Sequence, residues 1–249
     1  MKILVTNDDG VYAPGLLALA KALSSLGEVE VVAPSQGQSG AGHGITFLEP
    51  LTADQVTIAA ERRAWSVSGT PADCVKLGLQ ELLPDRPDLV VSGINAGANR
   101  GVDVLYSGTV AAAAEAALNG IPAVAVSLEK SDGFDFESAA GWALKVLSPI
   151  LEGGIPRGQV LNINVPAASR GAARGIRLVP QSLSAWEDGY DRRQDPRGRD
   201  YYWLTADEPV SDPRNPSDSG ALADGWVTVT PLQFDLTAHE QIIAWQGLW

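Results

Sequence analysis

Two adjacent carboxylates, Asp8 and Asp9, lie in the first loop of the chain, directly after the short apolar segment 3–6. Like charges this close repel each other unless a cation or a proton lies between them. A set of oxygen donors suits a hard divalent cation such as Mg²⁺ or Mn²⁺. The run from Asn7 to Gly10 is also typical of a turn that leads into a helix. Taken alone, this loop leaves both a metal site and a plain turn open.

A second loop, 35–44, is rich in Gly, Ser and Gln. Ser39 offers a hydroxyl, and small residues such as Gly40 let a ligand approach the backbone N–H groups closely. His43, one of two histidines in the chain, could donate a proton to a leaving group. An ordinary surface loop with a hydrogen-bonding histidine has the same composition, so both interpretations stay open.

A third loop, 93–109, supplies amide oxygens from Asn95 and Asn99 and then reaches Ser107, Gly108 and Thr109, directly before the alanine-rich run 110–118. Free N–H groups and the helix dipole make such a helix start an anion site. Ser107 or Thr109 can also cap the helix, which is compatible with anion binding. A cation beside an anion cradle suits phosphate-ester hydrolysis, because a metal polarises the phosphoryl oxygen and lowers the pKa of a bound water.

The sequence lacks the motifs of several other kinds of nucleotide-binding, metal-binding and hydrolytic sites. The sequence contains no phosphate-binding P-loop, no Gly-x-Gly-x-x-Gly fingerprint at the first strand–helix turn and no Gly-x-Ser-x-Gly elbow. It also has no Cys/His cluster for zinc and no cysteine nucleophile near the three loops.

The elements that must position these loops alternate along the chain. Strands are predicted at 3–6, 29–33, 88–92, 121–128 and 160–165, and helices at 14–23, 70–83, 110–118 and 136–151. This rhythm predicts an α/β fold with a doubly wound, mostly parallel, Rossmann-like sheet, from which 47–67 makes a hairpin excursion. Ligand sites of such sheets lie at the carboxyl ends of the strands, where all three loops begin.

The composition and the periodicity of the sequence change after about residue 181. Residues 186–218 have weak periodicity, but Tyr201, Tyr202 and Trp203 carry too much aromatic surface for a solvated linker. We therefore expect an extended arm that packs on the domain or on another subunit, followed by a late strand at 226–236 and a terminal helix at 239–249. The predicted organisation is a catalytic core at 1–181 and a C-terminal part at 182–249 that belongs to the same domain and to an oligomer interface.

Composition narrows the class of partner. The 249 residues carry a net charge of −12, which argues against binding a nucleic acid polymer. The single Cys74 excludes an intrachain disulfide and fits a reducing compartment. No signal peptide and no apolar run of bilayer length is visible, so a cytoplasmic protein without membrane contact is expected.

The motifs resemble the SurE family, the stationary-phase survival proteins, which are metal-dependent nucleotidases. The resemblance covers nearly the whole chain. Its most specific pieces are residues 3–10, 39–40 with 45–46, 68–75, 87–99, 104–110, 162–166, 195–199 with 201–203, and 228–232.

The resemblance implies an enzyme that hydrolyses nucleoside 5′- or 3′-monophosphates. It also implies one Mg²⁺ or Mn²⁺ ion per subunit and assembly into a homodimer or homotetramer. Its metal ligands would be Asp8, Asp9, Ser39 and Asn95, with the two aspartates catalytic. By the same resemblance, the phosphate and substrate contacts would be Asn7, Gly40, His43, Asn99, Ser107, Gly108 and Thr109. Gly42 departs from the serine expected in many relatives, which leaves substrate preference open.

Two other functions remain. A phosphatase that forms an aspartyl-phosphate on Asp8 usually has a second aspartate two residues on, where this chain has Gly10. A receiver-like or nucleotide-sensing module would use the acidic pair as a metal switch without turnover. The loop after the third buried strand offers such a module Asn95, with no aspartate beside it to phosphorylate.

Overall fold

A nine-stranded sheet forms the body of the protein in the computed structural model, which describes residues 1–131, 133–183, 187–207 and 216–248. The strand order is β3-β4-β2-β1-β5-β6-β7-β11-β8, and all neighbours from β4 to β7 pair in parallel. The strands are β1 (Lys2–Thr6), β2 (Glu28–Pro34), β3 (Ala53–Ile58), β4 (Arg62–Val67), β5 (Leu89–Ala96), β6 (Ala123–Leu128), β7 (Gln159–Val165), β8 (Ile176–Leu178) and β11 (Val227–Gln233). The predicted doubly wound, mostly parallel sheet is confirmed.

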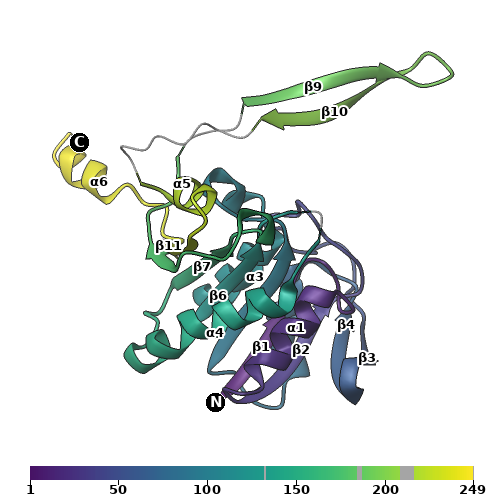
Figure 1. Cartoon of the computed structure of the whole chain (residues 1–249), viewed down its shortest axis with the longest axis vertical. Coiled ribbons are helices and arrows are strands. Elements are labelled where there is room, and N and C mark those ends of the chain that lie inside the picture. Colours follow the sequence, from purple (N-terminus) through teal and green to yellow (C-terminus); the bar gives the residue numbers. More distant parts are fainter. Residues whose placement is uncertain (132, 184–186, 208–215, 249) are drawn as a thin grey trace.

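Helices cover both faces of this sheet (Figure 1). Helices α1 (Pro14–Leu23) and α4 (Phe136–Gly153) pack on the face that receives Ile3 and Val5. Helices α2 (Pro71–Leu77) and α3 (Gly108–Leu118) pack on the face that receives Leu4. Successive side chains of a strand point to opposite faces, so β1 feeds two separate apolar cores.

Glycine at position 15 lets α1 approach the centre of the sheet. A Cβ atom on Gly15 would lie 2.1 Å from the carbonyl oxygen of Ile94, which is far inside contact distance. Pro14 suits the first position of α1, because the backbone N–H that proline lacks would have no partner within the helix at that position. The first loop is therefore followed at once by a helix seated tightly on β5.

The hairpin excursion lies at one edge of the sheet. Strands β3 and β4 pair antiparallel around a 3₁₀ turn, Ala59–Glu61, and β4 joins β2. Residues 47–52 precede this hairpin without strand structure, although the sequence suggested strands across 47–67. Their side chains, such as Phe47 and Leu48, are largely exposed.

The C-terminal part contains elements inside and outside the sheet. Strand β11 pairs antiparallel with β7, and α5 (Asp218–Ala223) precedes it. Strands β9 (Glu187–Gln194) and β10 (Asp200–Asp207) form a separate two-stranded hairpin that stands away from the sheet, and α6 (His239–Trp245) ends the described chain (Figure 1). The periodicity of 186–218 predicted neither strand, because both faces of this hairpin mix charged and aromatic residues.

No helix within the described ranges is long and apolar enough to cross a membrane.

Candidate metal and phosphate site

The three predicted loops meet at one cavity of about 290 Å³. They leave the carboxyl ends of β1, β2 and β5, which are neighbours in the sheet. The lining residues are Asp8, Asp9, Ser39, Gly40, Asn95, Ala96, Ala98, Asn99, Asp103, Tyr106 and Ser107. A larger cavity of about 580 Å³ lies between α1, the Ala59–Glu61 turn and the start of α4, with mainly apolar walls and none of these residues.

Asp8 is a buried carboxylate whose orientation is set by the start of α3. The Thr109 hydroxyl donates to Asp8 Oδ1, and the Thr109 backbone N–H also stabilises the charged form. Burial raises the pKa of Asp8 and the charge of Asp9 adds to the rise, whereas the bonds from Thr109 lower it in part. The net shift is upward, so the ionised pair calls for positive charge nearby.

Asp9 links the first loop to the end of β5. Its Oδ2 atom accepts a hydrogen bond from the Ala96 backbone N–H at 3.3 Å. Burial raises the pKa of Asp9, and the bond from Ala96 opposes that rise only in part. The pair is thus costly in its ionised form, which a bound cation would offset.

The other oxygen donors of the cavity are neutral. Asn95 donates its Nδ2 hydrogen to the Gly97 carbonyl at 2.8 Å, which leaves Oδ1 for a cation. Ser39 is an exposed residue on the opposite loop. Among the described residues, no group of three or more His, Cys, Asp and Glu side chains is arranged so that it could hold a metal ion. The donor set therefore fits a hard cation held by two carboxylates with amide and hydroxyl oxygens.

The start of α3 forms one side of the cavity, where an anion is predicted to bind. The Ser107 hydroxyl caps the helix by accepting from the Val110 backbone N–H at 3.1 Å. Gly108 follows it, where a Cβ atom would lie 2.8 Å from Asp8 Cβ and 3.0 Å from its Oδ2. Only glycine lets the helix dipole and its free N–H groups come this close to the acidic pair.

Comparison with known proteins identifies the family of this chain. The family model described as "Survival protein SurE" matches residues 3–188. The chain belongs to the SurE family. A relative from Rhodopirellula baltica, named "5'-nucleotidase SurE", is 52% identical across 96% of this chain and 95% of its own. A relative from Moorella thermoacetica with the same name is 48% identical across 96% of this chain and 92% of its own.

A solved SurE structure supports the fold over the full length. The crystal structure of the SurE protein from Aquifex aeolicus superposes with a TM-score of 0.86 and 38% identity, and the match covers 100% of this chain and 99% of that chain. The resemblance drawn from the motifs is therefore confirmed at the level of family and fold.

Two of the expected SurE substrate contacts are engaged within the protein. Asn7 is fully buried and closes the first turn, donating to the Gly10 carbonyl at 3.0 Å and accepting from the Gly10 N–H at 3.3 Å. Asn99 lines the cavity, but its Nδ2 donates to Ser127 Oγ and its backbone N–H to Asn164 Oδ1, both at 2.8 Å. Through these bonds Asn7 stabilises the first loop and Asn99 the third.

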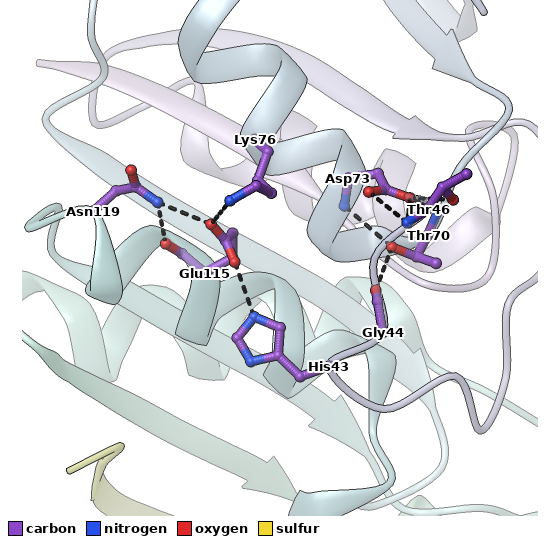
Figure 2. Close-up of polar contacts among 8 residues, drawn as sticks. All are labelled: His43, Gly44, Thr46, Thr70, Asp73, Lys76, Glu115 and Asn119. Carbon is purple, nitrogen blue, oxygen red and sulfur yellow. Dashed lines mark hydrogen bonds and ion pairs between the residues drawn. The ribbon is translucent and has the colours of Figure 1, made fainter. Parts of the chain in front are cut away.

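The His43 side chain contacts α3 outside the cavity. Its Nε2 atom lies 3.0 Å from Glu115 Oε2 on α3, as Figure 2 shows, and the residue does not line the cavity. Gly40 does line it. The expected contacts therefore divide into residues at the cavity and residues behind its walls.

The glycine at position 42 matches its backbone conformation in this SurE chain. Gly42 has a φ of +54°, which is costly for residues with a side chain, and a Cβ atom would lie 3.2 Å from the Leu105 carbonyl oxygen. Its N–H donates to the Tyr106 carbonyl at 3.0 Å. Gly42 thus joins the second loop to the third.

Motif reasoning missed two side chains of the cavity, Asp103 and Tyr106. Both belong to the segment before Ser107–Thr109, the candidate phosphate turn, and Gly101–Leu105 in this segment forms a 3₁₀ turn. The backbone carbonyl of Asp103 accepts from the N–H groups of Tyr106 and Ser107, both at 3.0 Å. Adjacency to Ser107 was the available signal, but it could not predict that the turn would face the cavity.

Proposed function

We propose that this SurE family member is a nucleotidase that hydrolyses nucleoside 5′-monophosphates. Its curated relatives carry the name 5'-nucleotidase over nearly their whole length. The observation that carries the proposal is the meeting of two carboxylates of raised pKa with a helix start at one cavity. That arrangement supports the binding of a cation and of an anion within one ligand's reach.

The proposed metal ligands are Asp8, Asp9, Ser39 and Asn95, holding one Mg²⁺ or Mn²⁺ per subunit. When bound, such an ion polarises a phosphoryl oxygen and lowers the pKa of a coordinated water. Thr109 orients Asp8 through its hydroxyl and its backbone N–H. Ala96 holds Asp9 toward β5. These contacts fix the two proposed catalytic carboxylates before any substrate arrives.

The proposed phosphate contacts are Ser107, the N–H of Gly108, and Gly40 across the cavity. The first turn of α3 offers donors and a favourable dipole to the phosphate. Asn7 and Thr109 support this set from behind the cavity, because their side chains already bond within the protein. Asn99 lines the cavity, and its Nδ2 bond to Ser127 holds it in place beside the phosphate contacts. Hydrolysis of 3′-monophosphates at the same cavity is part of the proposal.

We also propose that the protein forms a homodimer or homotetramer through its C-terminal part. The β9–β10 hairpin leaves Tyr190, Tyr202, Trp203 and Leu204 more than half exposed. On α6 and beyond, Ile242, Ile243, Trp245 and Leu248 are also more than half exposed. A second copy of the chain would remove this surface from water.

The test is phosphate release from a panel of 5′- and 3′-nucleoside monophosphates, with Mg²⁺, with Mn²⁺ and with excess chelator. We expect turnover that requires a divalent ion and is lost in Asp9→Asn. Undiminished turnover in chelator would refute the metal dependence. Tight nucleotide binding without turnover at saturating metal would instead favour the sensing module.

A further inference from the structure

The loop that carries Ser39 has little to hold it in place. Most of residues 35–48 are exposed, and the segment has no regular secondary structure. Ordering such a loop costs conformational entropy, which specific contacts must offset. Two backbone bonds attach it near the cavity: Gln38 N–H to the Asp8 carbonyl at 2.7 Å, and Gly42 N–H to the Tyr106 carbonyl at 3.0 Å. Side-chain contacts beyond Gly42 add the rest.

The first of these contacts joins His43 to α3 (Figure 2). Glu115 is nearly buried, with 8% of its side chain exposed, and its Oε2 lies 3.0 Å from His43 Nε2. Its Oε1 accepts from Lys76 Nζ and from Asn119 Nδ2, each at 3.0 Å. Because three donors surround it, Glu115 is a fixed carboxylate to which the loop is attached through His43.

The second contact joins the same loop to the start of α2 (Figure 2). The Thr46 hydroxyl donates to Asp73 Oδ2 at 2.6 Å, and the Thr46 N–H lies 3.1 Å from both Asp73 oxygens. The Thr70 hydroxyl donates to the Gly44 carbonyl at 2.8 Å. Thr70 and Asp73 also cap α2 reciprocally, so a rigid helix end holds the loop at 44–46.

We propose that His43 is a positioning residue whose contact with Glu115 fixes the 35–46 loop so that Ser39 reaches the cation. This inference rests on the proposed metal site, and it extends that site to α3 and α2. It also assigns a role to the motif at 68–75, which supplies Thr70 and Asp73. His43 then acts through the loop, and its ring takes no part in proton transfer to the leaving group.

The geometry separates this role from general acid catalysis. A proton donor must come within hydrogen-bond reach of the leaving oxygen. The His43 ring nitrogen nearest α3 is held by Glu115, and the residue is not part of the cavity lining. Glu115 itself lies on the helix that begins with the phosphate turn. The contact therefore sets the distance between the Ser39 loop and the anion site.

The experiment measures Mn²⁺ binding to the substrate-free protein by calorimetry, beside the pH profile of kcat/KM for a 5′-monophosphate. We expect His43→Ala and Glu115→Ala each to weaken Mn²⁺ binding by about tenfold, the worth of one hydrogen bond to a charged group. The double variant should be no weaker than either single one, because both remove the same contact. His43→Gln, whose amide can donate to Glu115, should restore most of the affinity.

Lys76→Met is the matched control. It removes a different partner of Glu115 and leaves the His43 contact in place, so it should weaken Mn²⁺ binding clearly less than His43→Ala does. Unchanged Mn²⁺ affinity in His43→Ala would overturn the proposal. So would a His43→Gln variant that binds Mn²⁺ normally yet loses kcat and one limb of the pH profile, which is the signature of a general acid.

Two further readouts keep these outcomes distinct. If Glu115→Ala fails to fold, as judged by circular dichroism, the His43→Ala and His43→Gln pair decides the question alone. If the wild type itself binds no Mn²⁺, the proposed metal site fails, and His43 has no ligand to position. Binding by the wild type that is lost in Asp9→Asn establishes the site independently of His43.

Discussion

At the scale of single residues, the acidic pair is the costliest feature of the site. Asp8 and Asp9 are adjacent, and burial raises the pKa of each. A carboxyl group whose pKa is higher in the folded state than in the unfolded state destabilises the fold once it ionises. The loss sets in as pH rises above the unfolded value near 3.8 and is complete above the raised folded value. At neutral pH without a cation, the pair therefore works against folding.

This sign leads to a prediction for Asp9→Asn. We expect turnover to fall by more than about 100-fold. Replacing a residue that only hydrogen-bonds to a metal ligand lowers activity by up to about 100-fold, and replacing the ligand itself should lower it further. We expect the free energy of unfolding in chelator to stay equal or rise, because the repulsion with Asp8 disappears. Urea denaturation and phosphate release on the same preparation check both parts. A clear loss of stability in chelator would show that Asp9 is mainly structural.

The residues of the site were predictable where residue type and loop position agreed. Asp8, Asp9, Ser39, Asn95 and Ser107 all line the cavity, because parallel strands bring their following loops to one edge. The direction of His43 was not predictable from local sequence. It depends on Glu115, 72 positions away, and on the packing of α3. Whether these residues perform the assigned chemistry stays a prediction.

At the scale of elements, Glu115 connects a loop and two helices through one charge. The hydrogen bond from His43 and, to a smaller extent, the contact with Lys76 outweigh burial and together lower the pKa of Glu115 to about 2. A lowered carboxyl pKa stabilises the fold above the ordinary value of 4.5, and this contribution is lost as pH falls toward 2.

Glu115→Gln should therefore change how stability depends on pH. We expect it to lower the free energy of unfolding at neutral pH by on the order of 1–3 kcal/mol. The gap between the variant and the wild type should narrow as the pH falls from about 4.5 toward 2, because the unfolded wild-type chain binds a proton at this carboxyl group before the folded protein does. Urea denaturation across this range checks the prediction. A gap that is independent of pH would mean that packing, and not charge, accounts for the effect.

Glycines at two helix positions give a matched test of how tightly α1 sits on the sheet. A Cβ atom on Gly15 would lie 2.1 Å from the Ile94 carbonyl oxygen, whereas one on Gly141 in α4 meets nothing within 4 Å. Gly15→Ala should destabilise the fold by about 3 kcal/mol or more, as overpacking of backbone does. Gly141→Ala should stabilise it by about 0.5–1 kcal/mol. Thermal melting of both variants checks the contrast, and equal melting temperatures would contradict it.

The sequence predicted correctly those helices and strands that carry apolar side chains on one or both faces. Strands β1, β2, β5, β6 and β7 are rich in apolar residues and buried over most of their length, as parallel strands covered on both faces are. The strands β8, β9 and β10 escaped prediction because their exposed residues carry no alternating pattern. Strand β5 runs through Ala96, beyond its predicted end at 92, because its polar tail pairs with Ser127 and Leu128 of β6.

At the scale of the whole molecule, the hairpin that stands away from the sheet exposes large apolar side chains. Trp203 and Leu204 are 59% and 62% exposed on β10. We expect the double variant Trp203→Glu with Leu204→Glu to shift the protein to a smaller species in light scattering, because like charges would meet in the contact. Secondary structure should be retained, since β9 and β10 pair only with each other.

The control is Leu118→Glu, at the end of α3, where the leucine is 61% exposed outside the arm. This variant should keep the wild-type mass. A double hairpin variant that also keeps the wild-type mass would remove the arm from the proposed interface.

The meeting of three loops at one cavity has a further consequence for folding. The proposed ligands span positions 8 to 95, and the phosphate turn extends the set to Thr109. No unfolded segment presents them together, so an ion bound there stabilises only the finished sheet. Its contribution grows as RT ln(1 + [L]/Kd), which is about 2.7 kcal/mol at a hundredfold excess over Kd. The supply of divalent ions would then set the lifetime of the folded protein as well as its turnover.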